Sequence, residues 1–136
     1  MIQQPPPNLP NDMKLIPTPD ERNLAMLTHL SALGGLIFLG GLGFIGPLII
    51  YLVQKEKSQF VTFHARDSLN QQLTLLLFNL VCGMLLIIGS FLCIGFLMIF
   101  PIIIAIITSI IFEILACIQA SRGEWTKIPI TIPLVS

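Results

Sequence analysis

Two ionisable residues lie inside apolar stretches of the sequence, where a charged group is costly and often functional. His29 lies in an apolar segment beside Thr28 and Ser31, and Glu113 is the only acidic residue inside an apolar run. Either residue could relay a proton or bind a cation. The structural alternative is a neutral histidine near the membrane surface and a protonated acid that share a buried hydrogen bond. We favour the structural interpretation, because a carboxyl group without a second acidic partner does not by itself indicate transport.

Small residues accompany Glu113 along its segment. Ala105, Ser109, Glu113, Ala116 and Ala120 recur at spacings of three and four, so they share one face of a helix. Such a face lets another helix approach closely in a membrane. We therefore expect Glu113 to face a helix bundle rather than lipid.

The segment from 58 to 72 carries a second set of polar side chains. On a helix His64, Asp67, Ser68 and Gln71 form one polar stripe, because they occupy positions i, i+3, i+4 and i+7. We expect this stripe to hold its helix to a neighbour through buried hydrogen bonds; a docking surface is the second interpretation and an active site a distant third.

Neither a metal-ligand cluster nor a nucleophile motif accompanies these residues. We predict no catalytic, cofactor-binding or metal-binding residue, no cofactor, and a protein that is not an enzyme. The candidate polar packing or docking residues are His29, Ser31, His64, Asp67, Asn70, Gln71 and Glu113.

The composition excludes most classes of soluble protein. Of 136 residues, 54% are hydrophobic and 10% charged, whereas a soluble domain carries about 25% charged residues. The mean hydropathy is +0.89. The net charge of +0 offers no electrostatic footprint for nucleic acid. The sequence therefore predicts an all-α integral membrane bundle.

Helix signals divide the apolar sequence into four segments. Thr18 and Glu21 form a capping box that starts the first helix, and four glycines and a proline at 40–47 interrupt it. The stretch 73–118, in which Glu113 is the one charged residue, is long enough for two crossings, which form a hairpin. The predicted membrane segments are about 19–39, 46–57, 66–92 and 96–120, with the second one short.

The basic residues favour a turn at the glycines of the first apolar block, which runs from about Leu24 to Val53. With that turn, all seven Lys and Arg residues lie on the cytoplasmic side, as the positive-inside tendency requires. A first block that crosses only once, giving three crossings, remains the alternative.

The predicted organisation is a disordered Pro-rich tail at 1–18, a membrane domain at 19–122 and a short cytoplasmic tail at 123–136. In that tail Trp125 is expected to anchor at the membrane surface, and Phe60 is expected at the headgroup boundary.

Several short motifs occur in a familiar order. They are Ala25-Met26-Leu27-Thr28-His29-Leu30-Ser31-Ala32-Leu33, Ile45-Gly46-Pro47-Leu48-Ile49, Phe60-Val61, His64-Ala65, Leu69-Asn70-Gln71, and Arg122-Gly123-Glu124 before Pro129. Over about residues 20–133 the chain resembles a bacterial family of small multi-pass proteins related to Tic-twenty, the chloroplast inner-envelope import component. The resemblance implies a four-helix membrane domain with both ends cytoplasmic. The link to a protein-conducting translocon is analogy alone, and Glu113 is not part of the family pattern.

These observations predict a multi-pass protein of the bacterial inner membrane with cytoplasmic N- and C-termini. The leading hypothesis is a non-enzymatic accessory or scaffold subunit of a larger membrane complex, such as a translocase. The alternative is a small homo-oligomeric channel or carrier that uses His29 and Glu113. The expected partners are the lipid bilayer and other membrane proteins or further copies of the chain, and not nucleic acid.

Overall fold

The structure is a computed structural model that describes residues 16–91, 94–125 and 127–135. These residues form helices and connecting segments without any strand, so the all-α prediction is confirmed. The predicted Pro-rich tail lies outside the described residues as far as residue 15. The helices are α1 (Pro19–Phe38), α2 (Ile45–Gln54), α3 (Gln59–Ser90) and α4 (Ile99–Ser121), with a short 3₁₀ helix η1 (Gly95–Met98) before α4.

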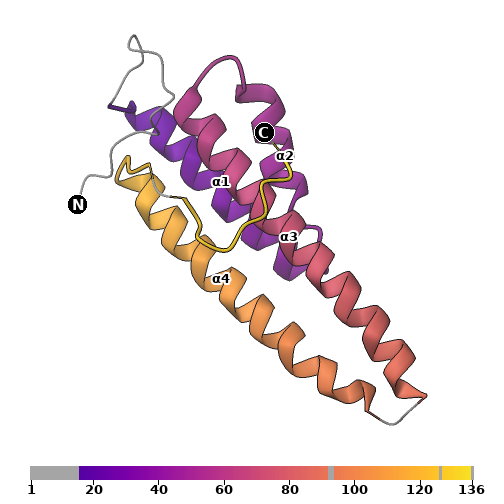
Figure 1. The fold of residues 1–136 in the computed structure, drawn as a ribbon. Helices are drawn as coiled ribbons and strands as arrows, with labels where there is room; N and C mark the ends of the chain where they lie inside the picture. The colour runs from indigo at the N-terminus through magenta and orange to yellow at the C-terminus, as the bar shows by residue number, and fades with distance from the viewer. Residues whose placement is uncertain (1–15, 92–93, 126, 136) are drawn as a thin grey trace.

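Helices α3 and α4 form a long antiparallel hairpin that sets the length of the molecule (Figure 1). The 32 residues of α3 extend over about 48 Å at 1.5 Å per residue, more than a bilayer core of about 30 Å. Only 11% of the apolar stretch of each helix is buried. A core helix of a soluble protein would be covered, whereas these two helices expose their apolar surfaces and are long and apolar enough to cross a membrane.

Helices α1 and α2 form a shorter hairpin beside the half of α3 and α4 that lies away from their turn (Figure 1). They are antiparallel, because Gly35 lies against Gly43 while Ser31 lies against Gly46. Neither helix is both long and apolar enough to cross a membrane alone. The chain thus reverses within its first apolar block, but the prediction of four membrane segments is not confirmed.

Side-chain caps fix where α1 and α3 begin. Thr18 and Glu21 form the predicted capping box, in which the Glu21 backbone N–H donates to Thr18 Oγ1 and the Glu21 carboxylate accepts from the Thr18 N–H. Ser58 accepts from the Val61 N–H, so α3 starts at Gln59 rather than at 66. Ser58 also donates to Glu21 over 2.8 Å, which joins the two helix starts.

The charged segments of the chain meet at one end of the bundle. The start of α1, the start of α3 and the end of α4 are joined there, since Ser58 bonds to Glu21 and His64 bonds to the Glu124 carbonyl. The Arg22 guanidinium lies close to Gly123. The opposite end of the hairpin is uncharged, because residues 68–112 contain no Asp, Glu, Lys or Arg.

Two aromatic residues lie elsewhere than expected. Trp125 is only 7% exposed and Phe60 only 3%, and their ring centroids are 5.1 Å apart in an edge-to-face contact. They pack with Ala25 and Ala120 in a small core between the helix ends. The prediction that they lie at the membrane surface is therefore wrong, because the capped helix ends leave an apolar gap that both rings fill.

The segment after α4 packs back along α3. Asn70 Oδ1 accepts from the backbone N–H groups of Leu134 and Val135, and its amide nitrogen donates to the Val135 carbonyl. Asp67 accepts from the Ile128 N–H over 2.7 Å. This extended segment crosses the face of the α3–α4 hairpin in Figure 1, so polar side chains of α3 hold its backbone in place.

We predict that Gly43→Ala destabilises the protein by about 1–3 kcal/mol, the usual cost of overpacking a tight contact. A Cβ atom at Gly43 would lie 2.5 Å from Gln72 Oε1 and 2.8 Å from the Ala32 carbonyl oxygen. Gly83→Ala is the matched control, because its Cβ would meet no atom within 4 Å and alanine favours a helix. Unfolding in detergent micelles measures both. Equal stability of the two variants would contradict the close packing at the α1–α2 turn.

Candidate functional site

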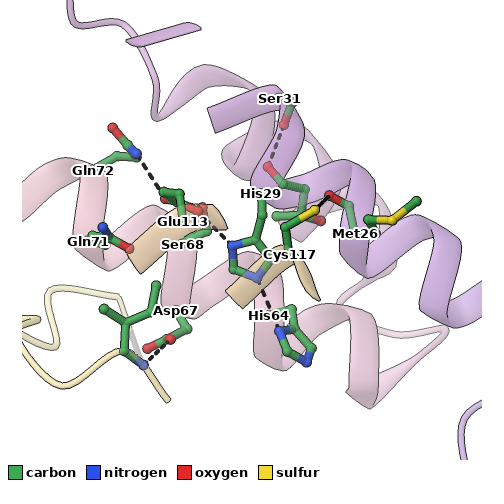
Figure 2. Close-up of polar contacts among 12 residues, drawn as sticks. Met26, His29, Ser31, His64, Asp67, Ser68, Gln71, Gln72, Glu113 and Cys117 are labelled. Atoms are coloured by element: carbon green, nitrogen blue, oxygen red, sulfur yellow. Dashed lines mark hydrogen bonds and ion pairs between the residues drawn. The ribbon is translucent and has the colours of Figure 1, made fainter. Parts of the chain in front are cut away.

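A chain of buried polar side chains connects α1, α3 and α4. Its centre is Glu113, which is fully buried on α4. One carboxyl oxygen, Oε2, lies 2.6 Å from His29 Nδ1 on α1. The other, Oε1, accepts from Ser68 Oγ and Gln72 Nε2 on α3, each over 2.9 Å. Figure 2 shows these side chains converging on the carboxyl group from the neighbouring helices.

The series of buried polar side chains continues from His29 to the charged end of the bundle. His29 Nε2 lies 3.1 Å from His64 Nδ1, and His64 Nε2 lies 3.0 Å from the Glu124 carbonyl oxygen. Gly123 directs that carbonyl: its φ of +78° turns the chain after α4, as glycine does readily. Both imidazole rings are fully buried.

These contacts determine how the protons are arranged. A carbonyl oxygen only accepts, so His64 donates through Nε2 to Glu124. With His64 neutral, its Nδ1 accepts, and His29 donates to it through Nε2. A single proton then lies between His29 Nδ1 and Glu113 Oε2. It belongs either to a neutral acid or to an imidazolium beside a carboxylate.

On its other side the polar chain reaches the α1–α2 turn. Gln72 donates to Glu113 through its amide nitrogen, and its amide oxygen lies against the Cα atom of Gly43. Only a residue without a side chain leaves room for that oxygen. Polar groups therefore run from the end of α4, through the core, to the turn between α1 and α2.

The other candidate residues lie around this chain or apart from it. Gln71 donates to the Ser109 carbonyl over 3.0 Å and so ties α3 to α4, whereas Asp67 and Asn70 bind the C-terminal segment. Ser31 donates to the Thr28 carbonyl on its own helix and lies outside the cluster. The structure thus brings together His29, His64 and Glu113, and it confirms the expected hydrogen bond between His29 and Glu113.

Gln72 is a central residue that the sequence analysis did not single out. It is 2% exposed and bonds directly to Glu113. The signal was present, because His64, Ser68 and Gln72 recur every four residues on one face of a helix. The predicted stripe instead ended at Gln71, which lies one position away from Gln72 and faces Ser109.

The chemistry available to this cluster is to hold or pass a proton. Imidazole and carboxyl groups in hydrogen-bonded sequence can exchange protons with little movement. Among the described residues no group of three or more His, Cys, Asp or Glu side chains is arranged to hold a metal ion.

The family model named MamF/MmsF, described as a magnetosome magnetite crystal formation protein family, matches residues 20–135. The chain belongs to this family. No curated protein and no solved structure matches it. Family membership and the two exposed apolar helices together identify a membrane protein.

The resemblance to the Tic-twenty-like family is wrong, because the matching model is that of the MamF/MmsF family. The proposed link to a translocase has no support and falls with it. The motifs that suggested it are short runs of small and apolar residues, such as Ile45–Ile49. Close helix packing in membranes favours such residues in many proteins, so they do not distinguish one family from another.

We predict that Glu113→Leu destabilises the protein by about 3 kcal/mol or more, because it leaves several buried donors without an acceptor. Glu113→Gln should remain within about 1 kcal/mol of the wild type, since its amide oxygen can accept from α3 while its nitrogen donates to a neutral imidazole. Unfolding of both variants in micelles measures the difference. Equal destabilisation of the two would contradict the hydrogen-bonding scheme.

Proposed function

We propose that this protein is a non-enzymatic scaffold or accessory protein of the membrane in which magnetite crystals form. Its membership of the MamF/MmsF family supports the setting. The observation that carries the role is the division of charge: one end of the bundle gathers the charged segments, whereas residues 68–112 contain no charged side chain. Iron ions and iron oxide surfaces bind carboxylate and imidazole groups. The uncharged hairpin end offers none, which favours a role within the membrane over contact with the mineral.

We place the charged end, with both termini, in the cytoplasm. Six basic residues belong to segments at the charged end of the bundle: Arg22, Lys55, Lys57, Arg66, Arg122 and Lys127. The positive-inside tendency supports this orientation in a bacterial inner membrane or a membrane derived from it. The α3–α4 turn then faces the opposite side.

The surface for partners is the exposed apolar face of α3 and α4. Leu80 is 59% exposed and Ile104 is 63% exposed, and small residues such as Gly83 leave open space on the same hairpin. In a bilayer, helices associate through close packing at such surfaces. A second membrane protein or another copy of this chain could therefore pack there.

Photo-crosslinking in native membranes tests the scaffold role. A photoreactive amino acid at Leu80 or at Ile104 should form adducts with another membrane protein or with a second copy, identified by mass spectrometry. The same probe at Leu69, which is 1% exposed, is the matched control and should give no intermolecular adduct. Adducts with lipid alone from both exposed positions would contradict a scaffold.

A proton carrier is the second candidate function, and the polar chain from Glu124 to Gln72 favours it. Hydrated ferrous and ferric ions release protons when they form a mixed-valence oxide, so a crystal-forming compartment must dispose of acid. The polar chain, meaning the series of hydrogen-bonded side chains, ends at the α1–α2 turn rather than at the far end of the α3–α4 hairpin. A complete path would need a further contribution, for example from a second copy.

Glu113→Gln separates the two candidates, because a glutamine side chain can keep the fold but cannot exchange a proton. A carrier predicts that this variant abolishes a pH-dependent proton flux in liposomes and fails to restore crystal size in cells that lack the protein. The scaffold predicts no flux from the wild type and normal crystals from the variant. Electron microscopy of the crystals and a pH-sensitive dye in the liposomes give the two readouts.

A further inference from the structure

A cavity of about 260 Å³ lies between α3, α4 and the C-terminal segment. Leu75 and Phe78 line it from α3, Phe112 from α4, and Ile128 and Ile130 from the segment that crosses the hairpin (Figure 1). Its described lining includes no charged side chain. The cavity thus has the mainly apolar walls of a small-molecule site, and its volume is slightly below the usual range of about 300–1,000 Å³.

One polar atom in the lining lacks a partner. Gln71 is 5% exposed, and its Oε1 is buried without a hydrogen bond among the described residues. The orientation of the amide is fixed, because the atom that contacts the Ser109 carbonyl must be the donating nitrogen. A buried acceptor without a donor costs free energy, and a group that donates a hydrogen bond to Gln71 Oε1 would remove that cost.

Two of the other polar side chains in the wall have partners within the protein, whereas the described residues give none for the Thr108 hydroxyl, which also lines the cavity. The Thr74 hydroxyl donates to the Asn70 carbonyl and accepts from the Ile132 N–H, and Ser109 Oγ accepts from Gln71. A buried water requires two to four polar partners. The walls are mainly apolar, so a molecule with an apolar body and one donor for Gln71 Oε1 fits the cavity better than a cluster of waters does.

The position of the cavity indicates where that molecule comes from. Phe78 and Ile130 line the cavity and are also 42% and 64% exposed, so the cavity reaches the apolar outer surface of the hairpin. In a membrane that surface meets lipid. A charged headgroup would be costly to bury against apolar walls, whereas a neutral hydroxyl group that is hydrogen-bonded to Gln71 would cost much less.

We propose that this cavity binds a neutral membrane lipid that carries a hydroxyl group. The hydroxyl donates to Gln71 Oε1, the first part of its hydrocarbon chain fills the space between Leu75 and Phe112, and the remainder lies along the hairpin. The C-terminal segment forms one wall of the site. Neither family membership nor the proposed scaffold role implies this binding.

The test uses the full-length protein in micelles and a photoreactive long-chain alcohol, with unlabelled hexadecanol and its methyl ether as competitors. The ether has the same chain but cannot donate a hydrogen bond. We expect crosslinks in the peptides that line the cavity, and we expect hexadecanol to compete about fivefold better than the ether, the effect of one net hydrogen bond.

Two variants and a control locate the site. Ala105→Phe should abolish labelling, because Ala105 lines the cavity. Ile104→Phe makes a similar change on the outer face, where Ile104 is 63% exposed, and should label as the wild type does. Gln71→Met should still be labelled but should lose the preference for the alcohol over the ether. Circular dichroism and size-exclusion profiles confirm that each variant is folded.

Three results would overturn the proposal: equal competition by alcohol and ether in the wild type, labelling confined to peptides outside the cavity, or no labelling. Unchanged labelling in a folded Ala105→Phe variant would also do so. These outcomes are independent of partner crosslinking at Leu80, so the lipid site and the scaffold role can fail separately.

Discussion

The structure depends on one carboxyl group that is buried among helices and must be satisfied there. Glu113 has no contact with solvent, and each of its oxygens is bonded to a side chain from another helix. An unsatisfied polar group in an apolar core costs several kcal/mol in order of magnitude, so the carboxyl group selects the arrangement in which α1 and α3 both face α4. His29 and Gln72 reach it only if α1 lies beside α3 in the observed register. The glycine at position 43 then follows from the same requirement, because the Gln72 amide lies directly against it.

This interaction divides the molecule into two parts with different physical character. In the part near the charged end, polar side chains are buried and paired, and the short α1–α2 hairpin and the C-terminal segment cover them. In the other part, α3 and α4 continue without cover and expose isoleucine, leucine and phenylalanine. The first part resembles a soluble core held by hydrogen bonds, and the second part requires lipid or another protein as its surroundings. A membrane scaffold uses both: the paired part fixes the hairpin, and the exposed part is available to neighbours.

Composition and periodicity predicted the helical class, the capping box at Thr18 and the hydrogen bond between His29 and Glu113, because each rests on local sequence or on depth in the membrane. The start of α3 at Gln59 was missed, since Phe60 was expected at the headgroup boundary ahead of a membrane segment that begins at 66, and only the Ser58 cap shows otherwise. Trp125 was misplaced for a related reason: an aromatic residue at a helix end suits both the membrane surface and a core between helix ends, and only tertiary packing decides. The role of Gln72 and the return of residues 127–135 along α3 depend on contacts between distant parts of the chain, for which a single sequence gives little signal. Family membership came from comparison and not from the short motifs, which many packed membrane helices share.

A double-mutant cycle tests most directly whether the His29–Glu113 contact organises the bundle. The free energies of unfolding of His29→Leu, Glu113→Leu and the double variant would be measured in the same micelles as the wild type. The account predicts that the double variant is more stable than the sum of the two single losses implies, by about 1.5 kcal/mol or more, because residues in one buried network are coupled. Losses that add within about 0.5 kcal/mol, as they do for independent sites, would contradict it.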